Sequence, residues 1–186
     1  MGKRSDFERR PRDYYQTPKA AVTPLLVHIK EEGFTFCEPC AGDGRLILHI
    51  EELRPDSECI AAFDIEPQGD EDIAELDALD MTPGHVIGCD YIITNPPWDR
   101  TKKSGYLLHE MIKHFSDLRP TWLLFDADWA YTLQSSKLIQ RCEKIVSVGR
   151  VKWIEDSAGT GKDNAAWYLF DKNWSEGYTK FYGRVA

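Results

Sequence analysis

The hydrophobic pattern of the chain predicts strands and helices in alternation. Four apolar runs are typical of buried strands: residues 34–38, 59–63, 91–94 and 122–125. Apolar residues at helical spacing predict helices around residues 46–50 and 104–115. An earlier helix would have Thr17 as its N-cap, begin at Pro18 and end at Gly33. This alternation predicts an α/β fold, a mostly parallel sheet with helices on both faces.

The remaining segments complete the expected sheet. Residues 66–80 are acidic and predict a short helix and a weak strand, whereas residues 131–141 indicate a helix. Residues 145–154 and 165–170 indicate a closing hairpin, joined by a glycine-rich loop, that adds an antiparallel strand. Ligands of such sheets bind at the carboxyl ends of the strands, so polar residues at those ends are the candidates for chemistry.

Length and composition favour a single soluble domain. The 186 residues, 42% of them hydrophobic, suit one core, and we expect residues 14–186 to form one domain after a flexible basic arm, residues 1–13. No apolar run approaches the length of a membrane span, and the first twelve residues are charged. We therefore expect a cytoplasmic protein that does not bind membranes, as a monomer or homodimer.

Charge and cysteine content exclude two functional classes. A net charge of −8 argues against a protein that coats nucleic acid, although an enzyme could still contact phosphates through a local basic rim. Five cysteines, an odd number, indicate reduced thiols. Cys37 and Cys40 form a C-x-x-C pair, but the chain has no second pair and its histidines are scattered, so we expect no metal site.

Two strand ends have residues suited to a nucleoside ligand. The first predicted strand leads into a loop whose small residues allow close approach of the backbone to a ligand: Glu38, Pro39, Cys40, Ala41, Gly42, Asp43 and Gly44. Asp64 ends the second strand and can accept hydrogen bonds from ribose hydroxyls. Asp77, before Ala78, can accept from an adenine amino group. For both acids, a helix N-cap or a solvated carboxylate is the alternative.

The segment Asn95-Pro96-Pro97-Trp98 follows a buried strand directly. Its two prolines fix the backbone and lack N–H donors, so that carbonyl groups remain as acceptors beside the Asn95 amide. A pair of acceptors suits an NH2 group, which has two hydrogens to donate. Trp98 offers a flat face on which a base can stack. The alternative is a rigid turn with a core tryptophan.

Together these segments resemble a known family. Tyr15-Gln16-Thr17-Pro18, residues 36–44, Asp64-Ile65-Glu66-Pro67 and Asn95-Pro96-Pro97-Trp98 are similar to motifs of class I S-adenosylmethionine-dependent methyltransferases, in the amino-methyltransferase branch that acts on adenine. The resemblance covers roughly residues 14–171. It implies a Rossmann-like fold with a seven-stranded, mostly parallel sheet that includes a C-terminal hairpin strand.

The resemblance also implies roles for individual residues. It assigns catalysis to Asn95, Pro96, Pro97 and Trp98. It assigns binding of S-adenosylmethionine to Tyr15, Thr17, Pro18, Glu38, Pro39, Cys40, Gly42, Gly44, Asp64, Ile65, Asp77, Ala78 and Asn95. Beside Trp98, we expect substrate contacts from the basic residues Arg100, Lys102, Lys103 and Lys162, with Arg150 and Lys152 as further phosphate contacts.

The chain departs from the family pattern in two ways. Trp98 stands where Tyr or Phe is more usual, and the chain has little room for a separate target-recognition domain. We expect methylation of an adenine amino nitrogen in nucleic acid, with DNA favoured over RNA. The alternatives are adenine in RNA, a glutamine side-chain amide in protein, and a catalytically silent binding module.

Overall fold

A computed structural model describes residues 14–69, 72–98, 106–154 and 159–184. The expected basic arm, residues 1–13, lies outside the described residues, and so do Arg100, Lys102 and Lys103.

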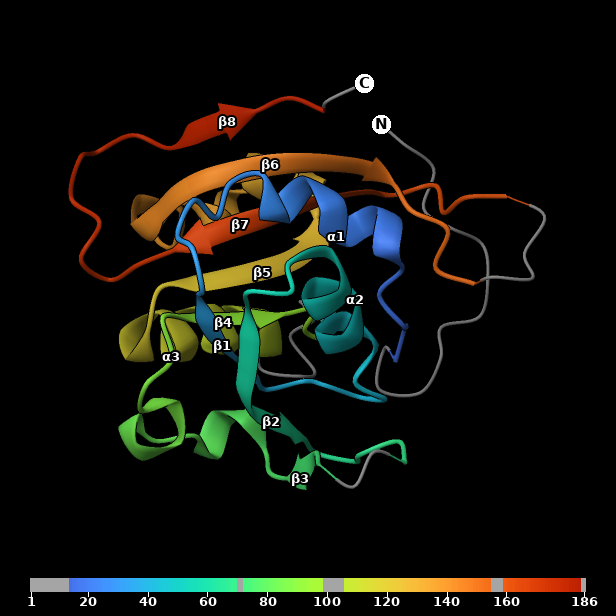
Figure 1. Ribbon diagram of the computed structural model, residues 1–186. Helices are drawn as coiled ribbons and strands as arrows, with labels where there is room; N and C mark the ends of the chain where they lie inside the picture. Colours follow the sequence, from blue (N-terminus) through green and yellow to red (C-terminus); the bar gives the residue numbers. More distant parts are fainter. Residues whose placement is uncertain (1–13, 70–71, 99–105, 155–158, 185–186) are drawn as a thin grey trace.

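The described chain forms an eight-stranded sheet in the order β3-β2-β1-β4-β5-β7-β6-β8 (Figure 1). The strands are β1 (Thr35–Glu38), β2 (Glu58–Asp64), β3 (Ala74–Glu75), β4 (Tyr91–Thr94), β5 (Thr121–Asp126), β6 (Cys142–Arg150), β7 (Asn164–Phe170) and β8 (Lys180–Tyr182). Only β7, among these, runs antiparallel to its neighbours β5 and β6. The predicted α/β class is confirmed, with one strand more than expected because β8 adds to the edge of β6.

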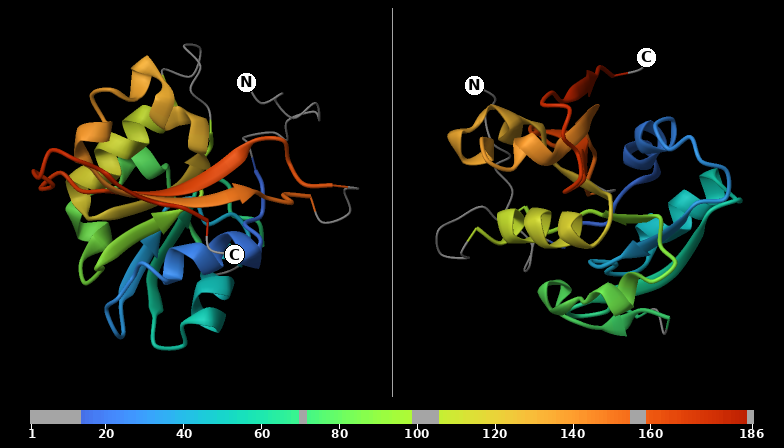
Figure 2. Two further views of the ribbon diagram at one scale, coloured as in Figure 1. Left: turned by 90° about the horizontal axis from the view of Figure 1, so that it is seen from above. Right: turned by 90° about the vertical axis from the view of Figure 1, so that its left-hand side faces the viewer.

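Helices cover both faces of the sheet, as expected. α1 (Lys19–Leu26) and α2 (Arg45–Leu53) lie on one face, and α3 (Leu107–Leu118) lies on the other (Figure 2). Each face has its own buried cluster, because strand side chains alternate between the two sides of a sheet. Trp122, Leu124 and Trp167 pack toward α1 and α2. Leu123 and Phe125 pack toward α3.

The first helix is shorter than predicted. Pro18 is its N-cap, one residue later than expected, and it ends at Leu26 rather than near Gly33. The Arg54 guanidinium donates to the carbonyl oxygens of Ile29 at 3.0 Å and Glu31 at 2.7 Å. These carbonyls therefore obtain their hydrogen bonds from a distant side chain instead of from a continued helix.

The predicted helix at residues 131–141 is wrong. The segment contains short 3₁₀ turns: η5 (Ala127–Tyr131), η6 (Leu133–Ser135) and η7 (Ile139–Arg141). Thr132 and Ser135 donate their hydroxyls to the carbonyls of Trp129 and Thr132, at 2.8 and 2.7 Å. Such local side-chain bonds compete with helical hydrogen bonding. The strand that follows, β6, also begins and ends earlier than predicted.

The acidic segment between β2 and β4 is close to prediction. It contains the two-residue strand β3 and the 3₁₀ turns η2 (Ala78–Asp80) and η3 (Pro83–Val86). This segment brings Asp77 to the same edge of the sheet as the end of β2, because β3 pairs in parallel with β2.

Two fully buried tryptophans on neighbouring strands have different hydrogen bonding. Trp167 Nε1 donates to the Ala21 carbonyl in α1 at 2.7 Å, whereas Trp122 Nε1 has no partner among the described residues. We expect Trp167→Phe to lower the free energy of unfolding by about 1–3 kcal/mol more than Trp122→Phe, because only the former leaves a carbonyl without its donor. Urea denaturation of both variants measures the difference, and equal losses would contradict it.

Candidate active site

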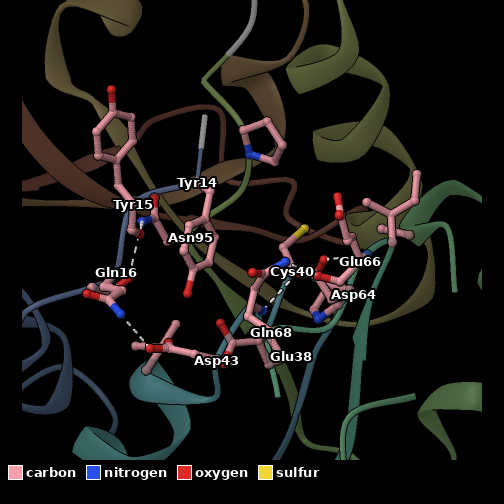
Figure 3. A pocket seen from close by; sticks show the side chains of 18 of the residues that line it. Tyr14, Tyr15, Gln16, Glu38, Cys40, Asp43, Asp64, Glu66, Gln68 and Asn95 are labelled. Atoms are coloured by element: carbon pink, nitrogen blue, oxygen red, sulfur yellow. Dashed lines mark hydrogen bonds between the residues drawn. The ribbon is translucent and has the colours of Figure 1, made fainter. Parts of the chain in front are cut away.

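A cavity of about 730 Å³ opens at the carboxyl ends of β1, β2 and β4 (Figure 3). Most of the residues predicted to bind the cofactor line it: Tyr15, Thr17, Glu38, Pro39, Cys40, Gly42, Asp64, Ile65, Asp77, Ala78 and Asn95. Pro97 of the predicted catalytic segment also lines it. The parallel strand order therefore gathers residues that are eighty or more positions apart in sequence, as the carboxyl-end rule predicts.

The loop after β1 is shaped by Gly42. Its φ of +57° is left-handed, and a Cβ at this position would lie 2.6 Å from Tyr14 Cε2. The Gly42 N–H donates to Asp64 Oδ2 at 2.8 Å, and its carbonyl accepts from the Gln68 N–H at 2.9 Å. Glycine is required here because the backbone is both strained for other residues and covered by an aromatic ring.

Asp64, at the end of β2, and Asp77, just after β3, both accept hydrogen bonds within the protein and could also accept them from a ligand. Asp64 Oδ1 accepts from the Glu66 N–H at 2.8 Å, and Asp77 Oδ1 accepts from the Leu79 N–H at 2.9 Å. Asp77 is thus the N-cap of η2, the alternative that its sequence context left open. Each carboxylate oxygen has more than one lone pair, so both side chains can still accept from a ligand in the cavity.

Glu38 is the most unusual group in the cavity. Its side chain is buried, and Oε2 has no hydrogen-bond partner among the described residues. Burial raises the pKa of this carboxyl well above its ordinary value, and the nearby charges of Asp64 and Asp43 raise it further. An unpaired buried carboxylate is costly, so this position fits a positively charged group of a ligand.

The Asn95 side chain is held by three hydrogen bonds. Its Nδ2 donates to the Thr17 hydroxyl at 3.1 Å and to the Tyr15 carbonyl at 3.3 Å. Its Oδ1 accepts from Trp98 Nε1 at 3.0 Å. Acceptors on one side and a donor on the other fix which way the amide points. The Thr17 hydroxyl, expected to cap α1, is used here instead.

The environment of Trp98 differs from the sequence expectation. The half-buried indole donates from Nε1 to the Leu124 carbonyl at 3.1 Å as well as to Asn95. It packs edge-on against Trp153, with ring centroids 5.4 Å apart. Trp98 is absent from the described residues that line the cavity, as are Pro18, Gly44 and Pro96. Stacking of Trp98 on a base stays a prediction.

Several lining residues were not predicted. They are Tyr14, Gln16, Ala41, Asp43, Arg45, Leu46, Glu66, Gln68, Leu107 and Met111. Gln16 Nε2 donates to Asp43 Oδ2 at 2.7 Å and so ties the segment before α1 to the loop after β1 (Figure 3). Gln16, Asp43 and Glu66 lie inside three of the four motif segments, which is a usable signal in the sequence. Leu107 and Met111 reach the cavity only because α3 packs beside it.

The exposed Lys162 does not line the cavity; it lies in the segment before β7. Among the described residues, no group of three or more histidine, cysteine or acidic side chains is arranged to hold a metal ion. None of the described helices combines the length and the apolar character needed to cross a lipid bilayer.

Comparison with known proteins gives a match in structure only. No family model and no curated protein matches the sequence. A methyltransferase subunit of a type I restriction-modification system from Streptococcus thermophilus superposes with a TM-score of 0.56 at 12% identity, over 86% of this chain. A Listeria monocytogenes protein assigned to the class I S-adenosylmethionine-dependent methyltransferases gives 0.59 at 11% identity, over 92% of this chain.

A third structure is similar in size to this chain. The E. cuniculi Mtq2–Trm112 complex, responsible for methylation of the eRF1 translation termination factor, gives a TM-score of 0.55 at 16% identity. The match covers 86% of this chain and 99% of that one, compared with 45% of the S. thermophilus chain and 66% of the L. monocytogenes chain. The fold is that of class I methyltransferases. The predicted Rossmann-like fold is thereby confirmed.

We expect Gly42→Ala to destabilise the protein more than Gly69→Ala. Both glycines have positive φ, +57° and +100°, but a Cβ at Gly69 would meet no atom within 4 Å. Gly69→Ala therefore reports backbone strain alone, of order 1–3 kcal/mol, and Gly42→Ala adds the clash with Tyr14. Urea denaturation should show that Tyr14→Ala recovers part of the loss in the Gly42→Ala background. Without such coupling, the clash is not what requires glycine.

Proposed function

We propose that this protein is an S-adenosylmethionine-dependent methyltransferase that acts on the exocyclic amino nitrogen of adenine in nucleic acid, with DNA favoured over RNA. The observation that carries the proposal is the Asn95 amide, held by three hydrogen bonds at the wall of a 730 Å³ cavity in a methyltransferase fold. The structural neighbours that include restriction-modification methyltransferases support the same reaction class.

The residues of the cavity fit S-adenosylmethionine. The volume is within the range of small-molecule sites. Glu38, buried and unpaired at Oε2, matches a cationic group such as the ammonium of the methionine part. Asp64 would accept from the ribose hydroxyls and Asp77 from the adenine amino group, while Gly42 allows the backbone to approach. When bound, the cofactor supplies an electrophilic methyl carbon on a positively charged sulfur.

The catalytic contribution of the chain is orientation of the target amino group. An adenine amino nitrogen is a weak nucleophile because its lone pair is delocalised into the ring. The remaining lone pair of Asn95 Oδ1 and the Pro96 carbonyl would accept its two hydrogens and favour a more tetrahedral nitrogen. The nitrogen gains a methyl group and loses one proton to solvent. Most of the rate enhancement then comes from positioning.

The target in a duplex would have to leave the base stack to reach Asn95. Trp98 and its basic neighbours Arg100, Lys102 and Lys103 support a nucleic-acid substrate, since an aromatic face and cations suit bases and phosphates. Adenine in RNA meets the same requirements and is the closest alternative within this proposal.

Methylation of a protein amide is the second candidate. A glutamine side chain also presents a planar NH2 group, so the arrangement at Asn95 would serve it equally well. The E. cuniculi neighbour, whose complex is responsible for methylation of a translation termination factor, favours this candidate because the match covers 99% of that chain. A catalytically silent binding module is the alternative outside enzymes.

Calorimetry and methyl-transfer assays test the proposal together. We expect the protein to bind S-adenosylhomocysteine and to transfer tritiated methyl groups to unmethylated DNA more than to transcribed RNA or a protein extract. Asn95→Ala should abolish transfer with little change in cofactor affinity, because it removes the orienting acceptor. Asn173→Ala, an exposed amide after β7, is the matched control and should be fully active.

The possible outcomes separate the candidates. Failure to bind both S-adenosylmethionine and S-adenosylhomocysteine would reject the proposal that the protein is a methyltransferase. Label found in protein alone would reject adenine and favour the amide. Retained transfer in Asn95→Ala would show that Asn95 does not have the proposed role.

Trp98→Phe tests whether the indole N–H positions Asn95. The change keeps an aromatic ring but removes the hydrogen bond to Asn95 Oδ1. We expect kcat to fall by about ten- to hundredfold, as for a misplaced catalytic group, with the affinity for S-adenosylhomocysteine nearly unchanged. The Leu124 carbonyl also loses its donor, so the thermal midpoint should fall, but by itself this does not change kcat. Trp153→Phe alters the same aromatic contact without touching Asn95 and is the control. Equal kcat values for the two variants would refute a positioning role for Trp98.

A further inference from the structure

A second hollow, of about 490 Å³, lies between η5, the ends of β6 and β7, and the chain after β8. We call it the β8 hollow. It is lined by Tyr131, Arg150, Asn164, Phe181 and Arg184, together with Asp128, Ile145 and several small residues. Phe181 reaches it because β8 pairs with β6, an addition that the hydrophobic pattern did not predict (Figure 1).

One end of the β8 hollow lies at the same edge of the sheet as the candidate active site, and the hollow extends back from that edge to Phe181, which is opposite Ile145 of β6. Arg150 ends β6 and Asn164 begins β7, opposite each other, and Asp126 at the end of β5 is opposite Ala165. β4, which leads into Asn95, is paired with β5. Three strand spacings of roughly 4.8 Å therefore separate the end of β4 from the end of β6, about 14 Å. That span is about four nucleotides along one strand of B-form DNA.

The side chains of the β8 hollow have an unusual combination of properties. Tyr131 is 86% exposed and Phe181 is 64% exposed, so two aromatic rings face solvent. Arg150 and Arg184 are exposed as well, and in the described part of the chain neither forms an ion pair. Arg184 Nη1 would lie 3.3 Å from a Cβ at Gly149, so the missing side chain there makes room for the guanidinium.

This combination matches one strand of a nucleic acid better than a protein surface. Exposed aromatic rings stack on bases of any identity, and guanidinium groups bind phosphates in a planar, bidentate geometry. Two arginines line this hollow, although the whole chain has a net charge of −8. An acidic protein that uses nucleic acid needs such a local basic site, because phosphate contacts supply most of the affinity.

We propose that the β8 hollow binds the substrate strand a few nucleotides from the adenine that enters the active site. Tyr131 and Phe181 stack against its bases, and Arg150 and Arg184 contact its phosphates. The inference rests on the proposed function and assigns a part of substrate recognition to β8 and the residues around it.

Fluorescence anisotropy with a labelled twenty-nucleotide DNA, single-stranded and as a duplex, tests this site in the presence of S-adenosylhomocysteine. We expect Arg150→Ala/Arg184→Ala to raise the Kd for DNA about tenfold. It should also reduce the slope of log Kd against log salt by about 1.5, because two phosphate contacts are lost. Tyr131→Ala/Phe181→Ala should raise the Kd with an unchanged salt slope, because stacking involves no charge.

Lys30→Ala/Lys113→Ala is the matched control. Both lysines are exposed and outside the β8 hollow, and the pair removes the same charge. We expect the control to change the Kd by less than about twofold. Unchanged affinity for S-adenosylhomocysteine and an unchanged thermal midpoint in every variant establish that the proteins are folded.

The outcomes distinguish this inference from the proposed function. If the wild type methylates DNA and the arginine variant binds DNA like the control, the β8 hollow is not a substrate site although the proposed function stands. The wild type could instead methylate only protein while Arg150→Ala/Arg184→Ala still raises the Kd for DNA and reduces the salt slope. In that case the β8 hollow binds nucleic acid and the substrate in the proposed function is wrong. Loss of methyl transfer to protein with unchanged DNA binding would overturn the inference in favour of a peptide site.

Discussion

Pairing of β1 with β4 is the contact on which the candidate active site depends. Phe36 lies opposite Tyr91 and Cys37 opposite Ile92, so the two strands end side by side. The chain leaves β1 toward β2 and leaves β4 toward β5, in opposite directions along the sheet. Their loops therefore diverge and leave a crevice between them. The loop around Gly42 and the segment that begins at Asn95 are the two sides of that crevice.

Polar contacts across this crevice join three separate parts of the sequence. Asn95 bonds to Tyr15 and Thr17, while Gln16 bonds to Asp43, so the segment before α1 is part of the site. The cavity is thereby held open around Glu38, whose buried carboxyl has an unpaired oxygen. A folded protein retains such an energetically costly group where a ligand compensates for it.

The extra strand changes how substrate recognition can be understood in a chain of this size. β8 lengthens the sheet beyond β6, and Phe181 within it and Arg184 after it add an aromatic and a basic side chain to the β8 hollow, which reaches the edge of the candidate active site. The proposed recognition surface then belongs to the same sheet as the candidate active site.

The sequence by itself determined the alternation of strands and helices from β1 to β5 and most of the residues at the carboxyl ends of those strands. Buried strands and glycine loops have local signatures, which is why Glu38, Gly42, Asp64 and Asn95 could be predicted. Tertiary structure alone decided where α1 ends, because the donor is Arg54, more than twenty residues away. It also decided that the Trp98 indole bonds to Asn95 and that β8 joins β6. Hydrogen bonds between groups that only folding brings together have no local pattern, so no reading of the chain in order could predict them.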